Sequence, residues 1–175
     1  MRMALAAIAF GSNLGRREVH LADALAALRR EVELVAVSSA YETAPMYVED
    51  QPPFLNGALL AQTEMGPREL LQVLKRVEQE VGRQPAKRFG PREIDLDLLS
   101  YGRLHYQFAD RGEPLLSIPH PRIPERRFVL EPLAEIAPDL QLPGLGSVSE
   151  LLAATHSQAD SVRRVEHAVL PILNH

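Results

Sequence analysis

The chain has 175 residues, a size that suits one domain with a substantial core. Its hydrophobic content of 46% and charged content of 24% are typical of globular proteins, and a net charge of −4 gives no sign of a nucleic-acid partner. Cysteine is absent, which excludes disulfides, thiolate metal sites and a cysteine nucleophile. The apolar run at 1–10 is too short to span a membrane and has no small-residue cleavage pattern, so we expect a cytoplasmic protein that does not bind membranes.

The hydrophobic pattern predicts alternating strands and helices up to residue 101. In chain order we expect a strand at 3–10, a helix at 16–30, a strand at 32–41, a loop at 44–53, a strand at 54–63, a helix at 67–81, a loop at 83–93 and a strand at 94–101. Pro67 suits the first turn of the second helix, and Gly82 suits its end. The order β-α-β-β-α-β predicts an α+β, ferredoxin-like (split βαβ) fold, an antiparallel sheet with helices packed on it.

The remainder of the chain is punctuated by prolines at 114, 119, 121 and 124. We expect a short helix at 128–136 and a terminal helix from about Ser147. The sequence shows no internal repeat and no low-complexity segment, and we predict a single domain over residues 1–175. Residues 156–175 carry no motif, and we expect them to form a C-terminal extension that packs on the domain or caps it.

Two aspartates alternate with aliphatic residues in the last predicted strand. Because side chains alternate between the two faces of a strand, Asp95 and Asp97 share one face, and their backbones lie about 6.6 Å apart. Such a pair can bind Mg²⁺ together with substrate phosphates, whereas most Asp-x-Asp pairs on amphipathic strands are only a solvent-facing surface. Aspartate is depleted in strands, and two neighbouring carboxylates repel each other without a cation between them. The adjacent Arg88 and Arg92 favour the metal-assisted transfer of a phosphate-bearing group.

Three further features are candidates for a site. The turn at Gly11-Ser12-Asn13 either presents backbone amides to an anion or only leads into a helix capped by Ser or Asn. His120 lies between two prolines in a basic segment. The prolines restrict the backbone of this segment, which suits a preorganised site. Phe54 and Asn56 share a strand face and could hold a flat, hydrogen-bonding heterocycle, although a phenylalanine is more often a core residue.

These residues together resemble the 6-hydroxymethyl-7,8-dihydropterin pyrophosphokinase family of folate biosynthesis. Several blocks carry the resemblance in the same order, namely residues 11–15 (GSNLG), 37–43 (VSSAYET), 50–56 (DQPPFLN), 88–97 (RFGPREIDLD), 118–121 (IPHP) and 126–133 (RRFVLEPL). The resemblance implies transfer of diphosphate from ATP to the hydroxymethyl group of the reduced pterin, with release of AMP. It also implies two Mg²⁺ ions and a monomer that acts on small molecules, with no nucleic-acid partner.

The resemblance assigns roles to individual positions. Asp95 and Asp97 match the metal ligands and, with Arg83 and Arg92, the catalytic group. The ATP-binding positions match Lys75, Glu78, Leu98, Ile118, His120 and Arg126. The pterin-binding positions match Thr43, Ala44, Pro45, Met46, Phe54, Asn56, Phe89 and Phe128. Lys75 and Pro121 depart from common family residues.

Two other kinds of function remain open from the residues alone. A small-molecule-binding or interaction module could use the same fold without catalysis. A metal-dependent phosphoesterase or nuclease could use the two aspartates, although such enzymes usually have more metal ligands than this strand supplies. Formation of AMP that requires the pterin distinguishes the pyrophosphokinase from both.

Overall fold

The computed structural model describes residues 2–44, 52–82, 94–109 and 116–165. The first part of the chain contains β1 (Ala4–Ser12), α1 (Arg17–Arg29), β2 (Glu33–Val37), β3 (Tyr41–Thr43), β4 (Phe54–Thr63), α2 (Pro67–Val81) and β5 (Asp95–Tyr101). The second part contains β6 (Tyr106–Phe108), β7 (Leu116–Ile118), η1 (Ile123–Glu125), α3 (Arg127–Ile136), β8 (Gln141–Leu142), β9 (Gly146–Ser147), α4 (Val148–Ala154), η2 (His156–Ser161) and β10 (Val162–Arg164).

The main sheet has the order β10-β3-β4-β1-β5, and β2 pairs with β4 beside β3. Every pair in it is antiparallel. The two long strands β1 and β4 are central, and the first and last strands of the β-α-β-β-α-β order, β1 and β5, are neighbours. The ferredoxin-like, α+β prediction is therefore confirmed.

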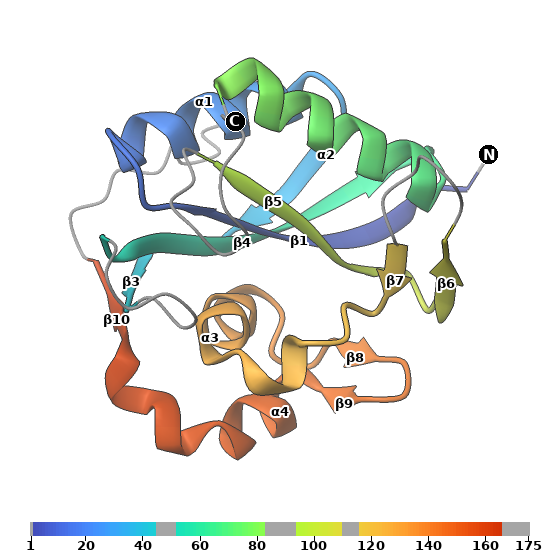
Figure 1. The fold of residues 1–175 in the computed structure, drawn as a ribbon. Coiled ribbons are helices and arrows are strands. Elements are labelled where there is room, and N and C mark those ends of the chain that lie inside the picture. The colour runs from blue at the N-terminus through green and yellow to red at the C-terminus, as the bar shows by residue number, and fades with distance from the viewer. Residues whose placement is uncertain (1, 45–51, 83–93, 110–115, 166–175) are drawn as a thin grey trace.

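Helices cover both faces of this sheet (Figure 1). The α1 and α2 helices lie on one face, where their apolar side chains pack on Ile8, Phe10, Leu59 and Leu96. The α3 helix lies on the other face, against small residues such as Ala7, Ala9 and Ala58, and α4 packs on α3 from outside. Burying one leucine or isoleucine side chain contributes about 1.5–3 kcal/mol, so these two layers supply most of the stability of the fold.

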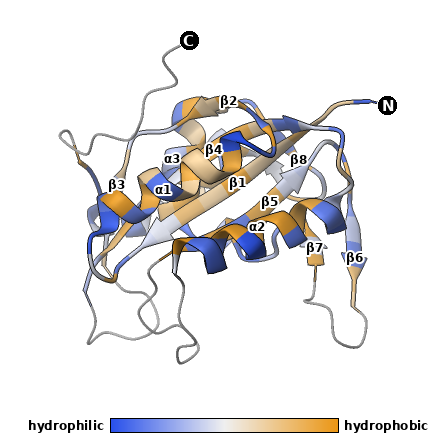
Figure 2. Cartoon of the chain, turned by 90° about the horizontal axis from the view of Figure 1, so that it is seen from above, coloured by the Kyte–Doolittle hydropathy of each residue, from blue (hydrophilic) through white to orange (hydrophobic). Residues whose placement is uncertain are grey.

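The α1 and α2 helices lie next to each other over the strands in the view of Figure 2. The α2 helix begins at Pro67 and ends at Gly82, whose φ of 105° is favourable for glycine. The sequence therefore predicted both ends of this helix. Its position matters for the site because α2 packs against β5.

The predicted strand at 32–41 is wrong as a single element. The structure divides it into β2 and β3, because Ser38 interrupts the ladder. The Ser38 Oγ accepts a hydrogen bond from the Ala58 N–H at 2.9 Å and donates one to the Ser39 carbonyl at 2.7 Å. A serine hydroxyl that bonds to nearby backbone groups competes with regular strand pairing, which explains the break.

The turn that the sequence predicts from Gly11 onward also begins too early. Gly11 and Ser12 belong to β1, and the N-cap of α1 is Arg16, without a side-chain cap hydrogen bond. Of the two alternatives for this turn, a helix capped by Ser or Asn is therefore not the one that the structure shows. Asn13 instead donates from Nδ2 to the Pro52 carbonyl at 3.0 Å, which ties this turn to the chain that enters β4.

The C-terminal part adds to the main sheet. Ser147 caps α4 by accepting a hydrogen bond from the Glu150 N–H, as a serine N-cap does. After α4, η2 leads into β10, which pairs with β3 as an edge strand. Part of the predicted extension thus continues the sheet, and residues 166–175 lie outside the described residues. No helix in the described ranges is long and apolar enough to cross a membrane.

Candidate active site on the α3 face of the sheet

The two aspartates of β5 share one face of the strand, as predicted. Ile94, Leu96 and Leu98 alternate with them and are at most 4% exposed, whereas Asp95 and Asp97 are partly exposed. Asp97 pairs with Ala9, which packs in the α3 layer. The carboxylates therefore belong to the sheet face that α3 covers.

The strand register places three site positions in one row across the sheet. Gly11 of β1 pairs with Asn56 of β4 on one side and with Asp95 of β5 on the other. Directly paired residues point to the same face, and neighbouring strands are about 4.8 Å apart. Asn56 and the metal-ligand candidates therefore share one surface, separated only by a glycine.

Asn56 is buried, and its amide is oriented by β3. Its Nδ2 donates to the Thr43 Oγ1 at 2.6 Å, and Thr43 is also buried. Phe54 pairs with Thr43 in the sheet and lies two residues before Asn56, so the ring lies on the same face. Ala44 is exposed, and its N–H donates to the Ser161 carbonyl at 3.4 Å.

The chain that enters β4 is fixed from α1. Arg17 donates from Nη1 to the Pro53 carbonyl at 3.0 Å and forms an ion pair with Glu42 at 3.2 Å. Together with the bond from Asn13 to Pro52, this contact holds the backbone just before Phe54. These two positioning contacts could not be read from residue spacing.

His120 and the start of α3 complete this region. The His120 N–H donates to the Leu99 carbonyl at 2.8 Å, which attaches the segment to β5. Its Nδ1 accepts from the Arg122 N–H at 3.2 Å, so the ring proton of a neutral imidazole belongs on Nε2. The Arg126 guanidinium lies 5.6 Å from the centre of the Phe128 ring, a cation–π contact.

The pKa values of Asp97 and His120 depend on the charged groups around them. Burial, and then the neighbouring Asp95 carboxylate, raise the pKa of Asp97 to about 7, while Lys75 and Arg126 act to lower it. Burial, followed by Arg126 and Arg122, lowers the pKa of His120 to about 4, against the opposing field of Asp95. The carboxylates, Arg126 and His120 thus lie close enough to perturb one another.

Glu78 supports the outer edge of β5 from the layer opposite to the aspartates. It is 1% exposed, and its Oε1 accepts a hydrogen bond from the Leu96 N–H at 2.8 Å. The Lys75 Nζ lies 3.3 Å from the same oxygen. This oxygen is therefore already engaged with β5 and α2.

Leu98 and Ile118 are core residues. Their side chains are 4% and 1% exposed and pack in the α1–α2 layer. At these two positions only backbone atoms could contact a nucleotide. The other predicted site residues, Pro45, Met46, Arg83, Phe89 and Arg92, lie outside the described residues.

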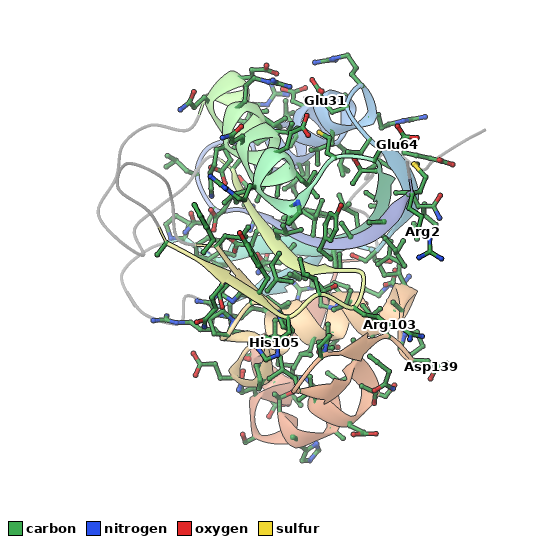
Figure 3. All side chains as sticks on the ribbon, turned by 90° about the vertical axis from the view of Figure 1, so that its right-hand side faces the viewer. Arg2, Glu31, Glu64, Arg103, His105 and Asp139 are labelled. Atoms are coloured by element: carbon green, nitrogen blue, oxygen red, sulfur yellow. The ribbon has the colours of Figure 1, made fainter. Side chains whose placement is uncertain are left out.

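The C-terminal end of β5 is followed by basic residues instead of a carboxylate pair. The strand ends at Tyr101, and the turn after it carries Arg103 and His105, both labelled in Figure 3. The described residues that follow, up to 109, contain no acidic pair of the Asp95–Asp97 kind. The start of β5, and not its end, is therefore the candidate site.

The donor set suits Mg²⁺ that is shared with a ligand. No group of three or more histidine, aspartate or glutamate residues that could hold a metal occurs within the described ranges. Mg²⁺ typically takes one or two carboxylates, with water and substrate phosphates completing its octahedron. Two carboxylates that repel each other, one of them with a raised pKa, fit this requirement.

The register across β4, β1 and β5 was the main feature that sequence reasoning missed. It places Gly11 between Asn56 and Asp95, although these three residues come from distant parts of the chain. One signal was present, because a ferredoxin-like order makes the first and last strands antiparallel neighbours. It could have indicated that the end of the first strand meets the start of the last.

Comparisons with known proteins show the family of this chain. The family model described as "7,8-dihydro-6-hydroxymethylpterin-pyrophosphokinase (HPPK)" matches residues 7–138. A Bacillus subtilis 2-amino-4-hydroxy-6-hydroxymethyldihydropteridine pyrophosphokinase is 44% identical over 78% of this chain and 80% of its own length. The Pseudomonas aeruginosa protein of the same name is 44% identical over 84% of this chain and 89% of its own.

Other relatives are longer. The folate synthesis bifunctional protein, mitochondrial, of Pisum sativum is 45% identical over 86% of this chain, which spans only 27% of that protein. The crystal structure of Plasmodium falciparum HPPK-DHPS wild type with pteroate superposes with a TM-score of 0.77 at 14% identity, over 93% of this chain and 48% of the other, which shows a shared fold. On the strength of the family model and the bacterial relatives, the chain belongs to the 7,8-dihydro-6-hydroxymethylpterin-pyrophosphokinase family.

Proposed function

We propose that this protein transfers the diphosphate group of MgATP to the hydroxymethyl group of 6-hydroxymethyl-7,8-dihydropterin and releases AMP. The single structural observation that carries this proposal is the row Asn56–Gly11–Asp95, because it places a buried amide for a heterocycle beside a carboxylate pair for metal-bound phosphates. Membership of the family and the names of the bacterial relatives support the same reaction in folate synthesis.

The pterin would lie on the α3 face near β4. The Asn56 amide, already bonded through Nδ2 to Thr43, retains its oxygen and its second N–H for the edge of a planar heterocycle. Phe54 from β4 and Phe128 from α3 are both on this face and would contact the ring system on its flat sides. Such contacts fix the orientation of the substrate hydroxyl group.

The phosphates would lie toward β5. Mg²⁺ held by Asp95 and Asp97 would neutralise phosphate charge, and two ions are expected from the family resemblance. His120 would donate from a neutral Nε2–H, because its other nitrogen already accepts from the Arg122 backbone. Arg126 adds fixed positive charge close to the carboxylates, as its influence on the Asp97 pKa indicates.

The reaction needs no protein nucleophile. The substrate hydroxyl oxygen attacks the β-phosphorus of ATP, the bond from that phosphorus to the oxygen of the α-phosphate breaks, and AMP leaves. Catalysis then depends on holding the two substrates in line and on stabilising charge at the phosphates. The residues of the α3 face supply the position, and the cationic groups supply the charge.

The substrates are small molecules. We propose that the protein acts as a cytoplasmic monomer without a nucleic-acid or membrane partner, although the matched Pisum sativum protein carries the word mitochondrial in its name. The net charge of −4 supports the absence of nucleic acid from the reaction.

The test is an incubation of the purified protein with ATP, Mg²⁺ and 6-hydroxymethyl-7,8-dihydropterin, with AMP measured by chromatography. The proposal expects AMP only in the complete mixture, and none when pterin or Mg²⁺ is left out. Formation of AMP or ADP at the same rate without pterin would indicate a hydrolase and contradict the proposal.

A further inference from the structure

Gly11 occupies the centre of the row that joins the amide and the carboxylates. A Cβ built at this position would lie well inside 3.0 Å of the Asn56 Oδ1, a separation that real Cβ atoms essentially never show. It would also lie 3.6 Å from the Asn56 Cγ and 3.7 Å from the Leu55 carbonyl oxygen, which are ordinary contacts. The conflict thus concerns one atom, the amide oxygen of Asn56.

Backbone conformation does not explain a glycine here. The glycines with positive φ in the described ranges are Gly15, Gly82, Gly102, Gly144 and Gly146, and Gly11 is not one of them. Gly11 lies in the regular pairing of β1 with both β4 and β5. An alanine could adopt this backbone without strain, so the requirement is for space above the strand.

The Asn56 amide cannot simply move away. Asn56 is 8% exposed, and its Nδ2 is bonded to the buried Thr43 on the β3 side. Its oxygen extends over β1, into the volume that a side chain at residue 11 would fill. A methyl group there would rotate the amide and break its bond to Thr43, which changes the direction of the donor and acceptor that a heterocycle would meet.

We propose that Gly11 is a specificity-determining position, whose missing side chain lets the Asn56 amide lie over β1 in the orientation that binds the pterin edge. Gly11 acts through Asn56 and does not itself contact the substrate, so it is a positioning residue. This inference rests on the proposed function, because it assumes that Asn56 meets a pterin.

The chain offers two matched glycine controls. A Cβ at Gly57 would overlap the Phe10 ring, which lies in the α1–α2 layer on the opposite face of the same sheet. Gly66, which precedes α2, has nothing within 4 Å of such a Cβ. Gly57→Ala therefore tests a clash in the same strand as Asn56 but on the opposite face of the sheet. Gly66→Ala tests the substitution without a clash.

The experiment measures the affinity of the protein for the reduced pterin and for a non-hydrolysable MgATP analogue by calorimetry. Gly11→Ala is expected to weaken pterin binding by tenfold or more and to change nucleotide binding by less than about threefold. Gly57→Ala is expected to lower the melting temperature without this selective loss, and Gly66→Ala to bind both ligands as the wild type does. Equal losses for both ligands, or unchanged pterin affinity in Gly11→Ala, would overturn the proposal.

A double-variant cycle separates the clash from other causes. In the Asn56→Ala background no amide remains to be displaced, so adding Gly11→Ala should cause no further loss of pterin affinity. An additive loss would overturn the proposal. If Gly11→Ala alone fails to fold, the double variant should fold, because the overlap is gone, and failure of both would show that Asn56 is not the reason for the glycine.

The same data distinguish this inference from the proposed function. Wild-type protein that neither binds the pterin nor forms AMP with it would contradict the proposed function itself. Wild-type activity with wild-type pterin affinity in Asn56→Ala would retain the reaction but remove the site assigned to Asn56. Selective loss in Asn56→Ala without loss in Gly11→Ala would contradict only the role of Gly11.

Discussion

The Glu78 carboxylate accepts a hydrogen bond from the backbone N–H of Leu96, the residue that separates Asp95 from Asp97. The contact crosses from α2 to the outer edge of β5 and is buried. It connects a helix on one face of the sheet to the strand whose carboxylates serve the other face. The position of the carboxylate pair therefore depends on a residue that lies behind it.

Glu78→Ala should lower stability and weaken MgATP binding together. It leaves the Leu96 N–H without this acceptor in a buried place, a loss that typically costs about 1–3 kcal/mol. Glu78→Gln keeps an acceptor oxygen and should retain more of both properties. Urea unfolding and nucleotide titration measure the effects, with Glu80→Ala on the exposed side of α2 as the control. Identical behaviour of the Glu78 and Glu80 alanine variants would contradict this role.

Asp97→Asn should increase stability in the metal-free protein while it removes activity. Because the pKa of Asp97 is raised to about 7 from an ordinary 3.8, the carboxylate makes the folded state less stable as the pH rises from about 4 through about 7. At pH 8 without metal, the variant should be more stable than the wild type by about 1–3 kcal/mol. Its turnover should fall by several orders of magnitude, because a metal clamp on the transferred phosphates is worth several kcal/mol.

The matched control for this change is Glu33→Gln on β2, an exposed acid outside the site. It should leave turnover unchanged. If Asp97→Asn and Asp95→Asn both turned over near the wild-type rate at saturating Mg²⁺, the assignment of metal ligands would be wrong.

His120 should make the protein less stable in acid. Its folded pKa is about 4, below the ordinary 6.5, so the unfolded chain binds a proton first as the pH falls. Its contribution is complete above about pH 6.5 and is lost as the pH falls toward 4. His120→Asn keeps an acceptor for the Arg122 N–H. Between pH 6.5 and pH 4, the free energy of unfolding of this variant should fall by about 2 kcal/mol less than that of the wild type, after allowance for the partial exposure of the ring. Parallel stability curves from urea unfolding at pH 7 and pH 4 would contradict the lowered pKa.

Phe54→Ala and Phe128→Ala should each weaken pterin binding by about 1–3 kcal/mol, the range for stacking a base-like ring on an aromatic side chain. Nucleotide affinity should change little, because the proposed function assigns both rings to the pterin. Phe108→Ala on β6, where the ring is covered by Arg68, removes an aromatic group elsewhere and serves as the control. Calorimetry that shows loss of nucleotide binding and intact pterin binding would place the two rings at an adenine site instead.

The sequence predicted the fold and the face of the aspartates because both depend on local periodicity. Alternation in residues 94–98 was sufficient to place Asp95 and Asp97 on one face, and α2 was predicted between Pro67 and Gly82 from its apolar spacing and its end signals. Ser38, which divides the predicted strand at 32–41, acts through a hydrogen bond to Ala58, twenty residues away. That contact depends on tertiary structure and has no local pattern.

The sequence proposed the residues of the candidate site but could not predict how they are arranged. Its geometry depends on the register of β4 and β5 against β1, which long-range pairing determines. The register explains why Gly11 matters to Asn56, and the buried edge of β5 explains why Glu78 bonds to Leu96. Neither relationship follows from spacing along the chain, because each joins elements that only the folded sheet brings together.

The transfer of an intact diphosphate group is the central claim, and the fate of the terminal phosphate of ATP tests it most directly. The protein is incubated with Mg²⁺, the reduced pterin and ATP labelled at the γ-phosphate, and the products are separated by chromatography. We predict that the label moves into the pterin product while unlabelled AMP forms in equal amount, because the β- and γ-phosphates move together. Label in inorganic phosphate or pyrophosphate, or formation of ADP beside a pterin monophosphate, would contradict the account.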